Sequence, residues 1–203
     1  MGEHSISQVS AAVERARAYS PFLALILDRE SVLEDALSAG RLDLTASSAD
    51  PTMTVARRLR LERRALALNV AIGDLAGVLD LTAVTGALTG FADYALDTAI
   101  RAAIEERTPG AEPRGFVGIA LGKQGSRELN YSSDIDPILL FDPATLPRRP
   151  REEPEESAVR IGKRVVELLQ ARDGDGYVLR VDLRLRPSPE ITPIVLPVDA
   201  AIG

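Results

Sequence analysis

The chain has 203 residues, a formal net charge of −6 and no cysteine. The negative charge argues against general binding to a nucleic-acid backbone, and the lack of cysteine excludes disulfides and thiolate chemistry. No apolar run approaches the 18 residues of a membrane-spanning helix, and the N-terminal residues lack the basic and apolar segments of a secretory signal. Composition therefore predicts a soluble, cytoplasmic globular protein that binds neither nucleic acid nor a membrane.

The first 107 residues carry apolar side chains at helical spacing. Ser20-Pro21 is a helix start, with serine as the N-cap and proline in the first turn, and Asp50-Pro51 repeats this signal. Gly40 is a helix stop. The predicted helices cover residues 7–19, 21–40, 52–79 and 81–106. We therefore predict an all-α region over residues 1–110, followed by a second region over residues 111–203.

The third predicted helix carries a run of arginines: Arg57, Arg58, Arg60, Arg63 and Arg64. These positions largely avoid the apolar stripe of the helix. The pattern leaves two interpretations open, a solvated helix face and a patch for phosphate or a partner protein, and favours the first.

Strand patterns begin only after residue 115. A proline-rich, charged stretch from Asp142 to Ser157 is typical of an exposed loop. Asp173 to Gly176 predicts a turn; it lacks the further spaced ligands and the terminal glutamate of a calcium loop. Strict alternation from Leu179 to Leu185 indicates a half-buried strand. The patterns together predict strands over 115–121, 135–141 and 177–186, and helices over 125–131 and 158–171.

Three aspartates are the candidate chemical groups. Asp134 and Asp136 are two residues apart on a predicted strand, so they share a face and lie about 6–7 Å apart along the chain. Paired carboxylates suit a hard divalent cation such as magnesium. Asp182 lies among arginines on the last predicted strand, where a charge-paired solvent face is the simpler interpretation. If that strand lies beside the first two aspartates, the three carboxylates could hold two metal ions for phosphoryl or nucleotidyl transfer.

The string GKQGSRELNYSSDID, followed later by RVDLRLRP, resembles the glutamine synthetase adenylyltransferase/adenylyl-removing family. That family belongs to the DNA polymerase beta-like nucleotidyltransferase superfamily. The superfamily pattern is a glycine turn, about ten residues, an Asp-x-Asp pair and a third acidic residue on a later strand. Gly122-Lys123 fits this spacing before Asp134, whereas Gly125-Ser126 leaves only seven residues. The resemblance implies an α+β fold, with an N-terminal helical bundle followed by a small nucleotidyltransferase core with a mixed sheet.

The resemblance also implies roles for individual residues. Two magnesium ions would be held by Asp134, Asp136 and Asp182, the last as third ligand or general base. Gly122 would let the backbone approach phosphates. The other implied nucleotide- and phosphate-binding residues are Lys123, Ser133, Arg184 and Arg186. Structural pairing remains an equal alternative for the two arginines, and a turn or cap role for Ser133.

The segment RELNYSSDID is similar to the N-terminal half of the family proteins, which removes adenylyl groups. The implied reaction is attack of orthophosphate on the adenylyl group of a glutamine synthetase tyrosine, which releases ADP. The implied partners are glutamine synthetase, ADP or ATP, orthophosphate and a PII-type regulatory protein. Two alternatives stay open: adenylyl transfer from ATP to glutamine synthetase or another acceptor, and an inactive remnant that acts as an interaction module.

Two features depart from the family pattern. The family proteins are much longer, so this chain corresponds to a truncated first half. Pro137 stands where an aliphatic residue is usual. Because proline lacks an N–H and is disfavoured in a central strand, it predicts either that the acidic strand begins outside the ladder or that the site has decayed.

Overall fold

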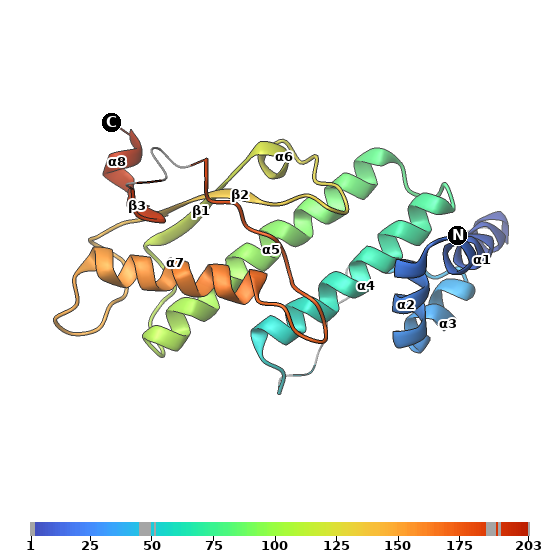
Figure 1. Cartoon of the computed structure of the whole chain (residues 1–203), viewed down its shortest axis with the longest axis horizontal. Coiled ribbons are helices and arrows are strands. Elements are labelled where there is room, and N and C mark those ends of the chain that lie inside the picture. The colour runs from blue at the N-terminus through green and yellow to red at the C-terminus, as the bar shows by residue number, and fades with distance from the viewer. Residues whose placement is uncertain (1–2, 45–49, 51, 186–189, 191, 203) are drawn as a thin grey trace.

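The computed structural model describes residues 3–44, 50, 52–185, 190 and 192–202. Helices come first in the chain, and a small sheet with further helices follows (Figure 1). The elements are α1 (Glu3–Tyr19), α2 (Pro21–Arg29), α3 (Ser31–Ser38), α4 (Val55–Leu75), α5 (Leu81–Arg107), β1 (Phe116–Leu121), α6 (Gly122–Gly125), β2 (Asp136–Phe141), α7 (Pro154–Gln170), β3 (Val195–Pro197) and α8 (Val198–Ile202). The predicted α+β class is confirmed. None of the helices in the described ranges is long and apolar enough to cross a membrane.

The N-terminal helices follow their capping signals closely. The Ser20 hydroxyl accepts a hydrogen bond from the Leu23 N–H (3.3 Å), as an N-cap should, and Pro21 opens α2. The predicted helix over 21–40 is nevertheless two helices, because the backbone at Glu30 leaves the helical conformation between α2 and α3. No glycine or proline marks that break in the sequence. The next helix begins after Thr54, which caps α4, and so starts later than predicted.

The sheet has three strands in the order β1-β2-β3. β1 runs antiparallel to β2, with Phe116 opposite Phe141 and Leu121 opposite Asp136, and β2 runs parallel to β3. Helices α5 and α7 pack against each other and against this sheet (Figure 1). Their buried side chains share one hydrophobic cluster with β2, which includes Ile100, Leu139, Phe141, Ile161 and Val165. This cluster also contains Ile135, the residue between Asp134 and Asp136.

The predicted strand over 177–186 is not a regular strand. Within its described part, Val181 forms only an isolated parallel bridge to Ile135. The Ile135 N–H donates to the Arg180 carbonyl (2.9 Å), and the Asp182 N–H donates to the Ile135 carbonyl (2.8 Å). Burial does not alternate at its start, since Val178 and Leu179 are both buried.

Pro137 explains why this pairing stops. Backbone groups two residues apart on a strand point to the same side, so Pro137 faces the same segment as Ile135. It has no N–H to continue the parallel ladder, and the chain separates after Asp182. On its other side Pro137 pairs with Ala120, so the start of β2 lies inside the β1–β2 ladder rather than outside it.

Two predicted helices of the second region are displaced. The helix predicted over 125–131 is wrong: the helical turn is α6, which begins directly after β1, and Arg127 has a positive φ of 61°. The helix predicted over 158–171 is present but begins at Pro154. The exposed loop predicted up to Ser157 is therefore shorter, because Pro154 occupies the first turn of α7, where its missing N–H costs nothing.

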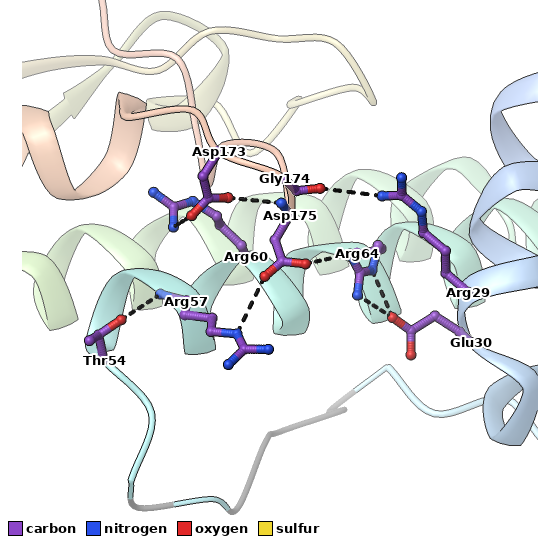
Figure 2. A network of polar contacts seen from close by, with 9 residues as sticks. All are labelled: Arg29, Glu30, Thr54, Arg57, Arg60, Arg64, Asp173, Gly174 and Asp175. Atoms are coloured by element: carbon purple, nitrogen blue, oxygen red, sulfur yellow. Dashed lines mark hydrogen bonds and ion pairs between the residues drawn. The ribbon is translucent and has the colours of Figure 1, made fainter.

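Two arginines of the α4 run, Arg60 and Arg64, are not on a solvated face. Arg60 is buried, with only 7% of its side chain exposed, and its guanidinium donates to Asp173 Oδ2 (2.5 Å) and to the Ala171 carbonyl (2.7 Å). Arg64 pairs with Glu30 (2.5 Å) and also reaches Asp175 (3.4 Å). Figure 2 shows these arginines converging from α4 on the turn at Asp173–Asp175. The favoured interpretation is therefore wrong for Arg60 and Arg64, whose partners in this turn lie more than 100 positions away in the sequence.

Arg60→Ala is expected to lower the free energy of unfolding by about 2–3 kcal/mol. It removes two charge-assisted hydrogen bonds from a buried guanidinium, one to Asp173 and one to the Ala171 carbonyl. Arg58→Ala on the same helix is the matched control and should change stability by less than about 0.5 kcal/mol. Urea unfolding of both variants measures the difference. Equal stabilities would show that the turn does not depend on Arg60.

Candidate active site

The fold brings the three predicted aspartates to one edge of the sheet. Asp136 is the first residue of β2, and Asp134 lies two positions before it. The bridge between Ile135 and Val181 aligns these two residues in parallel register. Side chains alternate along both segments, so Asp182 lies on the same face as Asp134 and Asp136. The juxtaposition therefore comes from the pairing of Ile135 with Val181, which joins segments 46 positions apart.

The Asp136 carboxyl lies beside the other two aspartates and against the Gly122 turn. Its pKa is raised, first by partial burial and then by the negative charges of Asp182 and Asp134. The positive charges of Arg184 and Lys123 offset part of this effect. The Gly122 backbone, with φ +54°, lies against the carboxylate, because a Cβ at Gly122 would stand 2.8 Å from Asp136 Oδ2. Glycine at this turn thus allows the backbone to approach Asp136.

The two outer carboxylates are each paired with an arginine. The Arg180 guanidinium donates to Asp134 Oδ1 and to the Ser132 carbonyl. Arg184 donates to Asp182 from its backbone N–H (2.9 Å) and from Nε (2.8 Å). The hydrogen bonds from Arg184 lower the pKa of Asp182 to about 2. Asp182 is therefore ionised at neutral pH.

The donor set fits a hard divalent cation by its chemistry. Three carboxylates on one face supply the oxygen ligands that magnesium prefers. No three acidic, histidine or cysteine side chains within the described residues are gathered closely enough to hold one ion as they stand. Asp134 and Asp182 instead contact Arg180 and Arg184.

Comparison with protein families identifies the chain. The model of the family described as Glutamate-ammonia ligase adenylyltransferase matches residues 9–202. The chain belongs to this family. The resemblance seen in the sequence motifs is thereby confirmed, and it extends into the helical region.

Curated relatives of the glutamate-ammonia ligase adenylyltransferase family agree. The chain is 46% identical over 170 residues to the bifunctional glutamine synthetase adenylyltransferase/adenylyl-removing enzyme of Caulobacter vibrioides, covering 77% of this chain and 17% of that protein. Proteins of the same description are 37% identical in Rhizobium meliloti over 84% of the chain, and 45% identical in Xanthobacter autotrophicus over 73%. The matches cover 18% and 16% of these two proteins. The chain thus spans about a sixth of the length of these relatives.

Of the other predicted site residues, Lys123 lies near Asp136, Ser133 lies in a turn and Arg186 lies outside the described residues. Lys123 is exposed on α6 and close enough to Asp136 for its charge to lower the pKa of that carboxyl. Ser133 closes a turn, since its hydroxyl donates to Asn130 Oδ1 (2.9 Å) and accepts from the Asn130 N–H (3.0 Å). Arg180, which contacts Asp134, was not predicted as a site residue, although its place two positions before Asp182 puts it on the same polar face.

Asp136→Asn is expected to stabilise the metal-free protein at neutral pH. A carboxyl whose folded-state pKa is raised above its unfolded value destabilises the fold when ionised, and this cost disappears as the pH falls and the carboxyl is protonated. The variant should therefore have a higher melting temperature than the wild type at pH 7 in EDTA. This difference should shrink as the pH falls towards about 4, the ordinary pKa of an aspartate. The control is Asp97→Asn, which removes an exposed carboxylate that pairs with Arg101 on α5. If the difference in melting temperature between Asp136→Asn and the wild type did not change with pH, the charge of Asp136 would not be its cause.

Proposed function

We propose that this chain removes adenylyl groups from glutamine synthetase by magnesium-dependent phosphorolysis. The observation that carries the proposal is the alignment of Asp134, Asp136 and Asp182 on one sheet face, beside the Gly122 turn. Family membership supports the class of reaction, because the relatives are named as enzymes that add and remove adenylyl groups on glutamine synthetase. The removal direction rests on the similarity of RELNYSSDID to the removing half.

The proposed reaction is phosphorolysis of the bond between the adenylyl group and the tyrosine. An orthophosphate oxygen attacks the phosphorus of the adenylyl group, the bond from that phosphorus to the tyrosine oxygen breaks, and ADP leaves. The freed tyrosine oxygen takes up a proton. Two magnesium ions held by Asp134, Asp136 and Asp182 would stabilise the attacking and leaving oxygens. Lys123 and Arg184 are exposed cations beside these carboxylates and can neutralise phosphate charge during substrate binding.

Adenylyl transfer from ATP to glutamine synthetase is the second candidate. It would use the same three carboxylates, and the relatives are named as bifunctional enzymes, which supports this candidate. The chain corresponds to about a sixth of those proteins, so the third candidate is an interaction module that lacks activity. Both enzyme candidates imply glutamine synthetase as partner, with a PII-type protein as the regulator expected from the resemblance.

The test is a pair of reactions with the purified chain and magnesium. One contains adenylylated glutamine synthetase and orthophosphate, and the other contains unmodified glutamine synthetase and ATP. We expect ADP and loss of the AMP group in the first and no pyrophosphate in the second. Pyrophosphate with AMP incorporation would favour adenylyl transfer, and no product in either reaction would favour the interaction module.

A further inference from the structure

The arginines of α4 line a cleft that none of the three candidate aspartates lines. This cleft of about 960 Å³ lies between α2, α4 and the Asp173–Gly176 turn. This volume is near the upper end of the range for small-molecule sites. Three aspartates also line the cleft, but the arginines outnumber them and make its lining positive in a chain of net charge −6. The six lining arginines are Arg15, Arg29, Arg60, Arg63, Arg64 and Arg172.

Most of these guanidinium groups have partners within the protein. Arg60 and Arg64 pair with carboxylates, as Figure 2 shows. Arg15 donates to the Leu75 carbonyl (2.7 Å), and Arg29 donates to the Gly174 carbonyl (3.4 Å). Four of the six lining arginines are therefore engaged by carboxylates or backbone carbonyls of the protein itself.

Among the described residues, Arg172 and Arg63 have no such hydrogen bond or ion pair. Arg172 is exposed to solvent, whereas Arg63 is partly buried. Its guanidinium lies 5.0 Å from the centre of the Tyr177 ring, and it forms no ion pair with a carboxylate of the described residues. Burial lowers its pKa, and the positive charge of Arg180 lowers it further. A partly buried cation without an anion is costly to the fold. In addition, the Nε of the neighbouring Arg60 is buried without a hydrogen-bond partner.

We propose that this cleft binds a phosphate-bearing small ligand, with Arg63 as its principal anchor. Guanidinium groups bind phosphate oxygens through paired, charge-assisted hydrogen bonds, and several of them together suit a group with more than one negative charge. Apolar side chains of α2 and α4, such as Leu23, Ile26 and Ala67, form walls that a nucleoside could contact. The ligand is therefore either free orthophosphate or the phosphate group of a nucleotide.

The site is separate from the acidic cluster but adjoins it. Ser132 lines the cleft, and its carbonyl accepts a hydrogen bond from Arg180, the residue that also holds Asp134. Binding in the cleft needs no divalent cation, because arginines rather than carboxylates contact the phosphate. This difference allows the cleft to be tested independently of the proposed reaction.

Isothermal titration in EDTA with orthophosphate, AMP, ADP and ATP tests the proposal. We expect saturable binding of at least one of them to the wild-type chain and to Asp134→Ala/Asp136→Ala. Arg63→Gln should weaken that binding at least about tenfold, because a charged hydrogen-bond donor is lost. Arg58→Gln on the same helix should bind like the wild type. Tighter binding of a nucleotide than of orthophosphate would identify the nucleotide as the ligand, and equal binding would identify the phosphate alone.

The melting temperature of Arg63→Gln and ligand binding by Arg63→Lys separate loss of the binding group from loss of the fold. Without ligand, Arg63→Gln should melt at the same temperature as the wild type or higher, since removing a partly buried cation without a carboxylate partner offsets the lost contact with the Tyr177 ring. Arg63→Lys keeps the charge but loses the planar fork, so it should bind with intermediate affinity. Unaltered binding by Arg63→Gln, loss of binding in the double aspartate variant, or no saturable binding of any of the four compounds would overturn the proposal.

Discussion

Asp136→Asn is expected to lower ADP formation from adenylylated glutamine synthetase by about 100- to 1,000-fold or more. Asp136 lies between Asp134 and Asp182 and against the Gly122 backbone, so it is central to the proposed metal site. Asparagine keeps its shape but removes the negative charge that would bind magnesium. The measurement is initial ADP release at saturating orthophosphate and magnesium.

The control for this variant is Asp97→Asn, which removes an exposed carboxylate on α5 and should retain wild-type activity. Because Asp136→Asn is also expected to raise stability without metal, loss of activity cannot be attributed to unfolding if the melting temperature is preserved. Activity of Asp136→Asn within a factor of about three of the wild type would exclude this carboxylate from the catalytic site.

Gly115→Ala is expected to lower the free energy of unfolding by about 3 kcal/mol or more. Gly115 has φ +71°, and a Cβ there would lie 2.4 Å from the Leu146 backbone nitrogen and 2.7 Å from its Cα. These are backbone atoms, so no side-chain rotation can relieve the clash. The turn they belong to is tied to Gly115 by the hydrogen bond from the Asp142 N–H to the Gly115 carbonyl (3.0 Å). Urea unfolding measures the loss.

Gly110→Ala is a matched control for the backbone conformation alone. Gly110 has a similar φ of +75°, but a Cβ there would meet no atom within 4 Å. The expected loss is about 1 kcal/mol, which is the cost of the left-handed conformation for alanine. If both variants lost the same stability, the close approach of Gly115 to Leu146 would not contribute to holding β1 and β2 together.

Local signals in the sequence were sufficient for much of the helical region. Ser20 and Asp80 both cap helices through their side chains, and apolar spacing placed α5 to within one residue at each end. The break at Glu30 has no local signal, since neither a glycine nor a proline lies there and Glu30 makes no capping hydrogen bond with its side chain. The arginines of α4 were misinterpreted because their partners, Asp173 and Asp175, reach them only in the folded chain.

The sequence predicted that Asp134 and Asp136 share a face, but it did not predict which side chains contact the candidate aspartates. The Asp-x-Asp spacing put Asp134 and Asp136 on one face, yet the place of Asp182 depended on a pairing register that the sequence does not specify. The alternating pattern around Asp182 predicted a full strand. Pro137 limits that strand to a single bridge, because it has no N–H to continue the pairing. This effect was not predicted, because Pro137 and the segment it faces lie far apart in the sequence. The pairing of Arg180 with Asp134 depends on the same register.

The most direct test of the central claim is a crystal structure of the chain soaked with manganese, which substitutes for magnesium and gives anomalous scattering. We expect anomalous density between Asp134, Asp136 and Asp182, with Arg180 and Arg184 moved away from the carboxylates they contact without metal. Density elsewhere only, or an acidic cluster that keeps both arginines at saturating manganese, would contradict the assignment of these three aspartates as a catalytic metal site.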